Sequence, residues 1–113
     1  MPSWAHKGFE LRLEAVFVMH HYCYIIYSAH LNRYYVGQTR DFSNRIEMHN
    51  AGFSAFTSKA KDWKLHLLIP CPDKSVALKI EAHIKSMKSR KFIENLARYP
   101  EMLTKVINKF ANS

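Results

Sequence analysis

The sequence predicts a small α+β domain, in the broader sense an α/β fold, with a three-stranded sheet flanked by helices in the order β-β-α-β-α-α-α. Three observations predict it. Two aromatic, β-branched runs are joined by a short polar link, a third such run comes after a helical segment, and the C-terminal third of the chain has a helical period. A chain of 113 residues can bury one core but not two independent ones, and it contains no internal repeat, so we expect one domain.

Three segments have the composition of β-strands. Residues 22–28 (YCYIIYS) and 33–38 (RYYVGQ) are rich in aromatic and β-branched side chains, and the polar link AHLN between them predicts a hairpin. A third strand is expected over residues 63–69, where the apolar run is ended by Pro70 and Pro72. The three strands are expected to form one sheet.

The first helix is expected directly after the hairpin, over residues 42–49. Gly37 closes the second strand at a place where the backbone must turn closely or approach a ligand. Thr39 and Asp41 then offer side-chain oxygens that can cap a helix N-terminus. Gly52 is suited to the left-handed conformation that ends many helices, so the helix is predicted to stop just before it.

Three further helices are expected in the C-terminal part of the chain. The helical pattern over residues 76–88 follows Asp73 and Ser75, either of which can serve as the N-cap. Shorter patterns cover residues 92–97 and 101–110, and a proline between them separates the two helices. The expected organisation is an extension over residues 1–19, a domain over residues 20–97 and a C-terminal helix over residues 98–113.

The net charge of the chain favours a polyanionic partner. The sequence has 17 Lys and Arg residues against 9 Asp and Glu residues, which gives a charge of +8 and a pI near 9.7. Such a field attracts nucleic acid or anionic lipid. Charge by itself names a class of partner and no particular one.

Cysteine usage and hydropathy point to the cytoplasm. Cys23 and Cys71 have no metal-site spacing and lie in apolar runs, so we expect reduced core thiols. No stretch reaches the roughly 18 apolar residues that a membrane span needs. Residues 9–19 are apolar but contain charged side chains that the core of a signal peptide lacks. We expect neither export nor a membrane partner, and no role is assigned to residues 1–19.

An acidic residue interrupts the apolar face of the helix expected over residues 76–88. This apolar stripe consists of Ala77, Ile80, Ile84 and Met87. Glu81 falls inside the stripe, and burying a carboxylate costs several kcal/mol unless it is paired or holds a metal. Glu81 is therefore either a functional ligand or one half of an ion pair with Lys85, which lies one turn further along the helix.

Four other residues are candidates for a site. Arg45 and His49 are spaced i, i+4 and project from the same side of their helix, either as part of a solvated surface or as a functional pair. Tyr24 and Tyr35 lie in the two strands of the hairpin, where aromatic side chains most often belong to the core. None of these residues identifies a function by itself.

Taken together, these segments resemble the GIY-YIG nuclease family. YCY, which ends at Tyr24, stands at the first motif without its glycine, and YVG, which begins at Tyr35, stands at the second. RDFSNRIEMHN matches the helix that bears Arg45, and SVALKIEAHIKSMKSRK is similar to the helix that bears the family's glutamate, here Glu81. The resemblance spans about residues 20–97 and is closest to short stand-alone members related to the nuclease module of the bacterial excision-repair endonuclease.

The spacing of the motifs supports the resemblance. Tyr35 follows Tyr24 by 11 positions and Arg45 follows Tyr35 by 10, as the family pattern requires. Gln38 stands where some repair-type members carry a lysine that helps to hold the phosphate. Positive charge from Arg40 or Lys59 would have to replace it.

The resemblance implies a metal-dependent endonuclease that hydrolyses phosphodiester bonds in nucleic acid, with DNA and DNA repair as the expected substrate and process. Glu81 would bind one Mg²⁺ or Mn²⁺, and Arg45 would brace the scissile phosphate. Tyr24 or Tyr35 would orient or deprotonate the attacking water, although tyrosine is a weak base at its usual pKa of about 10 unless a metal or cation lowers that pKa. His49 would assist proton transfer or contact phosphate.

Basic residues outside this site are candidates for contacts with a phosphate backbone. They are Arg40, Lys59, Lys85, Lys88, Arg90 and Lys91. Two rival functions stay open: a nucleic-acid-binding module of the same fold with weak or no turnover, and a non-enzymatic basic scaffold in which Glu81 forms a structural ion pair. The five intact candidates of the site, Tyr24, Tyr35, Arg45, His49 and Glu81, favour the enzyme.

Overall fold

The computed structural model describes residues 21–112, so the extension expected over residues 1–19 lies outside the described residues. The elements, in chain order, are β1 (His21–Ser28), β2 (Arg33–Thr39), α2 (Phe42–Asn50), the 3₁₀-helix η1 (Thr57–Lys59), β3 (Lys64–Cys71), α3 (Lys74–Met87), α4 (Arg90–Arg98) and α5 (Pro100–Ala111). This order confirms the predicted α+β class, with η1 as an additional short turn of helix between α2 and β3.

The sheet is antiparallel with the strand order β2-β1-β3, so β1 is central and both of its neighbours are edge strands. In the register of the sheet, Tyr24 of β1 lies opposite Gly37 of β2 and Leu68 of β3. The pairing with β3 shifts between Ile25 and Ile26, which is a bulge in the ladder. Because β2 has a strand on one side only, its outer edge is open to other parts of the molecule and to ligands.

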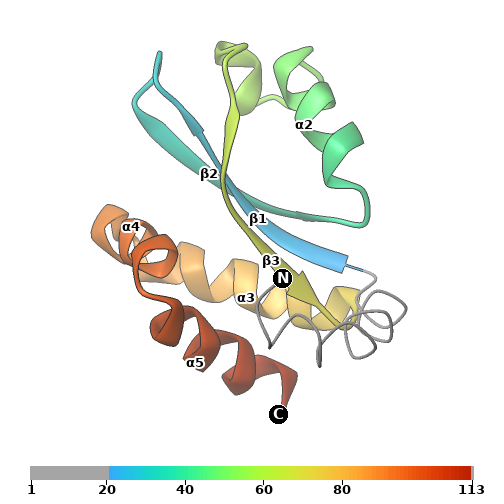
Figure 1. Ribbon diagram of the computed structural model, residues 1–113. Helices are drawn as coiled ribbons and strands as arrows, with labels where there is room; N and C mark the ends of the chain where they lie inside the picture. The colour runs from blue at the N-terminus through green and yellow to red at the C-terminus, as the bar shows by residue number, and fades with distance from the viewer. Residues whose placement is uncertain (1–20, 113) are drawn as a thin grey trace, which may run out of the picture.

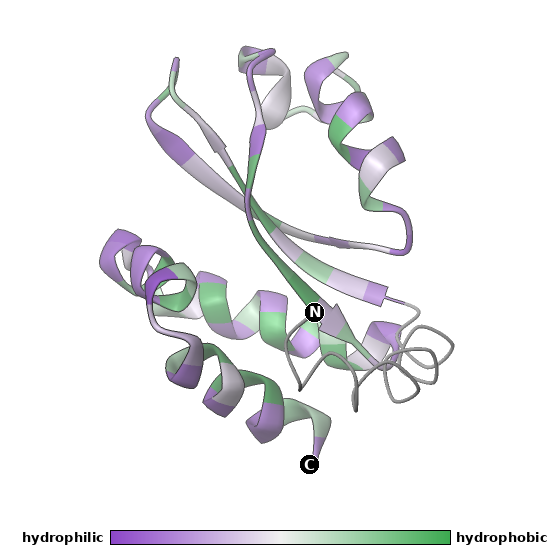
Figure 2. Ribbon diagram, viewed as in Figure 1, coloured by the Kyte–Doolittle hydropathy of each residue, from purple (hydrophilic) through white to green (hydrophobic). Residues whose placement is uncertain are grey.

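Helices cover the two faces of the sheet unequally. Figure 1 shows α3, α4 and α5 together on one face, and α2 with η1 over the other. Hydrophobic residues concentrate where β1 and β3 meet α3 (Figure 2). The core on the α3 side comprises Cys23, Ile25, Val36, Ile69, Cys71, Val76, Ala77, Ile80, Ile84, Leu96 and Val106. The core on the α2 side is smaller, with Tyr24, Ile26, Ala60 and Trp63 at its centre.

Local sequence signals explain where α2 begins and ends. The Asp41 side chain accepts a hydrogen bond from the backbone N–H of Asn44, as predicted for an N-cap. Gly52 has a φ of 85°, and its N–H donates to the carbonyl of His49 while the next N–H donates to the carbonyl of Met48. This is the Schellman arrangement, which confirms that Gly52 ends the helix.

Two expectations about the C-terminal half were wrong. Pro70 does not end the third strand, since β3 continues through it to Cys71. Proline is tolerated there because β3 is an edge strand, where no neighbour needs its missing N–H. Met87 does not belong to the buried stripe of α3, because it is the last residue of the helix and its side chain is exposed. Asp73, rather than Ser75, caps α3.

The two cysteines occupy the positions expected of core residues. Cys23 and Cys71 are both buried and both free. Burial raises the pKa of each thiol above its usual value, so both stay protonated at neutral pH. In the described part of the chain, no helix has both the length and the apolar character that crossing a bilayer requires.

Candidate active site

The phenol of Tyr24 is the centre of a buried polar cluster. Its hydroxyl lies 2.7 Å from Nε2 of His49 and accepts a hydrogen bond from Nε of Arg45 at 3.3 Å. Tyr24 comes from the central strand, and Arg45 and His49 both come from α2. The expectation that Arg45 and His49 share one face of their helix is therefore confirmed, and that face is directed at the sheet rather than at solvent.

Gly37 makes room for this phenol. A Cβ atom added at Gly37 would lie 2.5 Å from the Tyr24 hydroxyl oxygen and 2.6 Å from Cζ, closer than two such atoms can approach. The glycine was expected to allow a close turn or the approach of a ligand. It allows the approach of Tyr24 from the neighbouring strand, so the absence of a side chain at Gly37 is what leaves space for the Tyr24 phenol.

The imidazole of His49 is held on both sides. Its Nδ1 lies 2.6 Å from Oγ1 of Thr57, which is buried in η1. The indole N–H of Trp63 donates to the carbonyl of Thr57 at 2.8 Å, and the side chain of Asn50 bonds both backbone groups of Trp63. These three residues were not singled out from the sequence, because the segment between α2 and β3 has no periodicity that would mark an inward-facing threonine.

Burial sets the charge states of this cluster. Burial, and secondly the charge of Arg45, lower the pKa of His49 to about 4, so the ring is neutral at pH 7. The hydrogen bond with Tyr24 raises the pKa of Arg45, which keeps the guanidinium charged. Burial raises the pKa of Tyr24, and the Arg45 hydrogen bond partly opposes that rise.

A neutral His49 has two tautomers, and they give Tyr24 different roles. With the proton on Nδ1, the ring donates to Thr57 and accepts the proton of the Tyr24 hydroxyl at Nε2. With the proton on Nε2, both His49 and Arg45 donate to the Tyr24 oxygen, and the Tyr24 proton is free to point elsewhere. In both tautomers every polar atom of the cluster has a partner, which agrees with the absence of unsatisfied buried side-chain polar atoms among the described residues.

Tyr35 is the second tyrosine, and its surroundings differ from those of Tyr24. Its ring lies 6.5 Å from the ring of Tyr24, meets the His49 ring edge-on at 5.1 Å and stacks on Phe56 at 5.6 Å. Tyr35 is only partly buried, whereas Tyr24 has 0% exposure. The two tyrosines are therefore not equivalent, and of the two only Tyr35 is partly exposed to solvent.

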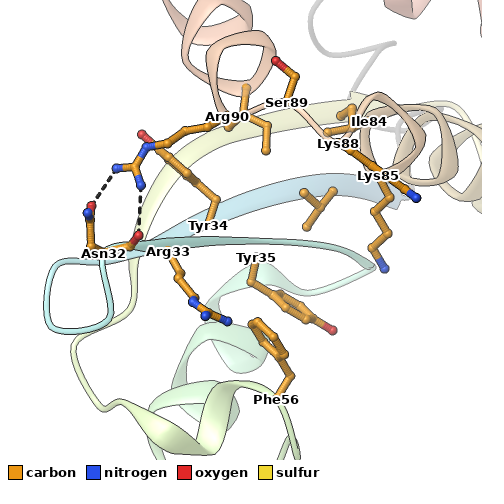
Figure 3. Close-up of a pocket in the computed structure, with 12 residues that line it drawn as sticks. Asn32, Arg33, Tyr34, Tyr35, Phe56, Ile84, Lys85, Lys88, Ser89 and Arg90 are labelled. Atoms are coloured by element: carbon orange, nitrogen blue, oxygen red, sulfur yellow. Dashed lines mark hydrogen bonds between the residues drawn. The ribbon is translucent and has the colours of Figure 1, made fainter.

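Glu81 lies over the opposite face of the sheet from Arg45 and His49 (Figure 1). It lies on α3, and its side chain is 17% exposed, so it is at the rim of the helix's apolar stripe rather than inside the core. Its Oε2 lies 2.6 Å from Nζ of Lys85, and the same Nζ lies 5.8 Å from the centre of the Tyr35 ring. Figure 3 shows Lys85 extending from α3 past the edge of β2 toward Tyr35. Lys85 thus connects the carboxylate on one face with the aromatic cluster on the other.

The donor set near Glu81 suits one hard cation that keeps most of its water. Among the described residues there is no group of three or more His, Cys, Asp or Glu side chains that could hold a metal. Mg²⁺ commonly binds through one or two carboxylates and retains several water ligands, whereas zinc sites require three or four protein ligands. A single rim carboxylate such as Glu81 is the kind of oxygen ligand that a hard divalent cation accepts.

The basic candidates are dispersed over the surface. Lys88, which precedes α4, and Lys91, in the first turn of α4, are both exposed. Lys59 is exposed at the end of η1. Arg90 donates to the backbone carbonyl and the side-chain oxygen of Asn32, at 2.9 and 2.7 Å, so it ties α4 to the β1–β2 hairpin.

Arg40 and Gln38 lie toward the start of β1. Arg40 is exposed and lines a hollow with His21 and Asp73, and no described contact joins it to Arg45 or His49. The side-chain oxygen of Gln38 lies 2.5 Å from Nε2 of His21. Gln38 is thus engaged with β1 and is not directed at the buried cluster.

The site thus combines a three-stranded antiparallel sheet, a tyrosine, an arginine and a histidine joined by hydrogen bonds over one face, and a glutamate at the rim of the other. The family model described as the GIY-YIG catalytic domain matches residues 20–95. The chain belongs to the GIY-YIG family, whose members are nucleases that generally depend on a divalent metal. No curated protein and no solved structure matches the chain.

Proposed function

We propose that this chain is a metal-dependent endonuclease that hydrolyses phosphodiester bonds in DNA. The observation that carries the proposal is the convergence of Arg45, His49 and Tyr35 around the Tyr24 phenol, with Glu81 at the neighbouring rim. A phosphodiester is already anionic, so its hydrolysis needs a positioned water and positive charge aimed at the transition state.

Arg45 binds the scissile phosphate. Its hydrogen bond to Tyr24 uses Nε, which leaves the two terminal nitrogens of the guanidinium to donate to phosphate oxygens. Arg45 lines a small hollow of about 180 Å³ together with His49, Met48, Phe53 and Ser54, which is where the phosphate would enter. Tyr24 is a positioning residue, since it fixes the arginine and is itself fully buried.

Tyr35 contacts the attacking water, because it is the tyrosine that a substrate can reach. Glu81 holds a single Mg²⁺ or Mn²⁺, which when bound supplies positive charge to the phosphate and an activated water. His49 stays neutral, fixes the Tyr24 hydroxyl through their hydrogen bond and lines the phosphate hollow beside Arg45. A metal on Glu81 would replace the ion pair with Lys85, whose ammonium lies 5.8 Å from the centre of the Tyr35 ring and would add positive charge beside the substrate.

DNA, DNA repair and the cytoplasm are the finer parts of this proposal. DNA and DNA repair are supported by the likeness of the sequence to short members related to the excision-repair nuclease module and by the charge of +8. The cytoplasm is supported by the two free, buried cysteines. Lys59, Lys88 and Lys91 would contact the phosphate backbone of the DNA. Arg90 has a structural role in addition to any contact of this kind, because it holds the hairpin.

A second candidate is a nucleic-acid-binding module that has weak or no turnover. One observation favours it: Lys85 already neutralises Glu81 at 2.6 Å and so competes with a metal for the same carboxylate. The two candidates differ in one measurable property, which is whether a divalent ion at millimolar concentration displaces the lysine and starts cleavage.

The decisive experiment is a cleavage panel. End-labelled DNA and RNA, each as single strand, duplex and flap, would be incubated with the purified chain in Mg²⁺, Mn²⁺ or EDTA. We expect metal-dependent cleavage of DNA, with no products in EDTA and none from an Arg45→Ala variant. Binding of every substrate without cleavage in either metal would select the second candidate instead.

A further inference from the structure

A pocket of about 580 Å³ lies along the open edge of β2, beside the candidate active site. Its walls come from β2, from Phe56 before η1, and from α3 and the start of α4. Tyr35 and Lys85 line this pocket and also belong to the proposed catalytic group. A molecule in the pocket would therefore lie next to the phosphate that is cut.

The lining combines flat aromatic surface with positive charge. Phe56 stacks on Tyr35 with ring centres 5.6 Å apart and planes inclined by 29°, and its side chain is 42% exposed. The charged residues of the lining are Arg33, Lys85, Lys88 and Arg90, and the lining contains no carboxylate. Aromatic faces beside cations are the features with which proteins hold single-stranded nucleic acid.

The cations are distributed so that two of them remain available for a ligand. Lys85 is paired with Glu81, and Arg90 is engaged with Asn32 and Glu94. The side chains of Arg33 and Lys88 make no hydrogen bond or ion pair with any other residue in the described range 21–112. Figure 3 shows Arg33 and Tyr35 on the same side of β2 as Phe56, with Tyr34 and Arg90 on the other side.

We propose that this pocket binds one unpaired nucleotide that flanks the scissile phosphate, so that the enzyme prefers single-stranded or flapped DNA over continuous duplex. The volume lies within the roughly 300–1,000 Å³ of small-molecule sites, enough for a nucleotide. A base inside a duplex cannot reach an aromatic wall without leaving its stack, whereas an unpaired base reaches it at little cost. Phe56 supplies the stacking surface, and Arg33 binds the adjacent phosphate.

The proposal rests on the nucleic-acid function above, and binding measured without turnover separates the two. A 12-nucleotide single strand and a 12-base-pair duplex, each with one 2-aminopurine, would be titrated with the protein in EDTA, and fluorescence anisotropy and 2-aminopurine emission recorded. For the single strand we expect about tenfold tighter binding than for the duplex, together with a change in emission as the base stacks on Phe56.

Matched variants locate the effect in the pocket. Phe56→Ala should weaken single-strand binding by about tenfold and leave duplex binding within about twofold, since stacking is lost but backbone contacts are kept. Phe56→Trp should retain tight binding. The control is Tyr99→Ala, an aromatic residue of nearly equal exposure, 41%, between α4 and α5 and outside the pocket, which should change neither affinity. Thermal midpoints of all variants should stay close to that of the wild type.

Three outcomes would overturn the proposal. They are equal affinity for single strand and duplex, equal weakening of both by Phe56→Ala, and tight binding of an extended peptide at the β2 edge that competes with the oligonucleotide. If the single strand binds as described but nothing is cleaved in Mg²⁺ or Mn²⁺, the nucleotide pocket stands and the nuclease function fails. If DNA is cleaved with no dependence on Phe56, the nuclease function stands and the pocket fails.

Discussion

The two faces of the sheet are built for different purposes. On the α3 side, the buried hydrophobic cluster consists of aliphatic side chains and two cysteines. On the α2 side, a tyrosine, a histidine and a threonine are fully buried and joined by hydrogen bonds of 2.6 and 2.7 Å. Burial of apolar surface stabilises a fold without requiring a particular orientation of each side chain. A series of hydrogen-bonded side chains, by contrast, fixes the orientation of every residue in it. The comparison indicates that one face supplies stability and the other supplies geometry for chemistry.

Glu81 is the strongest test of this difference between the two faces, because it lies on α3, on the stabilising face, but is proposed as the metal ligand. Glu81→Gln should lower metal-dependent cleavage by about a thousandfold, since the amide keeps the shape of the side chain and loses the charge that holds a hard cation. The thermal midpoint should change little, because a partly exposed i, i+4 pair contributes only about 0–1 kcal/mol. Cleavage assays and thermal melts would be compared side by side.

A matched control exists for that substitution. Glu94 forms the same kind of i, i+4 pair with Arg90, at 3.3 Å, so Glu94→Gln removes a similar charge without touching the proposed metal ligand. Its cleavage rate should equal that of the wild type. A Glu81→Gln protein that melts early but still cuts at the wild-type rate would remove Glu81 from the active site and leave it as a structural ion pair.

A substitution in the aliphatic core should have the reverse effect. Ile69 of β3 is fully buried on the α3 side, so Ile69→Ala should reduce the free energy of unfolding by about 2–5 kcal/mol. Leu65→Ala on the same strand is the control, because Leu65 is 47% exposed and should cost less than about 1 kcal/mol. Urea melts give the stabilities. Cleavage by the Ile69→Ala protein would be measured in buffer without urea, where the variant is folded. A loss of cleavage there would contradict the view that the α3 face supplies stability and not catalysis.

The two tyrosines offer a sharper test within the polar face. Tyr24→Phe removes the partner of buried His49 and of Arg45, so it should cost about 1–3 kcal/mol of stability and lower cleavage by about tenfold through a loosened arginine. Tyr35→Phe should leave stability almost unchanged and lower cleavage by about a hundredfold, as expected for a group that contacts the attacking water. Melting curves and single-turnover rates measure both. Opposite phenotypes would exchange the roles of the two residues.

A further prediction, on stability alone, is a dependence of the free energy of unfolding on pH that originates in His49. Its pKa is about 4 in the folded chain against 6.5 for an unperturbed histidine, so the unfolded chain binds more protons between these values. Stability should be unaffected by this residue above about pH 6.5 and should fall as the pH drops from there toward 4, by at most about 1.4 kcal/mol per pH unit.

The contribution of His49 is isolated by difference. Urea melts between pH 4 and 7 would be recorded for the wild type, His49→Gln and, as a control, His30→Gln, whose side chain is exposed in the hairpin turn. The slope should weaken in His49→Gln and persist in His30→Gln. An unchanged slope in His49→Gln would mean that the buried ring is not the group that titrates.

The pattern of residues along the chain was sufficient to predict the elements of the fold. Alternating aromatic and β-branched runs, the caps at Asp41 and Asp73, and the glycine at position 52 set where strands and helices begin and end, because these are local properties of the backbone. The spacing of Tyr24, Tyr35 and Arg45 likewise indicated the family before any contact was known.

Only the tertiary structure determined which of these residues are buried in the site and which remain exposed. The sequence presented two similar tyrosines, and only the pairing of β1 with β2 places Tyr24 under Gly37 in the interior and Tyr35 at the open edge. Thr57 holds His49 from a segment without periodicity, so no local signal could mark it. The sheet order also explains why Pro70 lies within a strand, and it brings Lys85 around the edge of β2 to Tyr35. Such contacts join residues distant in the chain, and their energies depend on packing that no single segment contains.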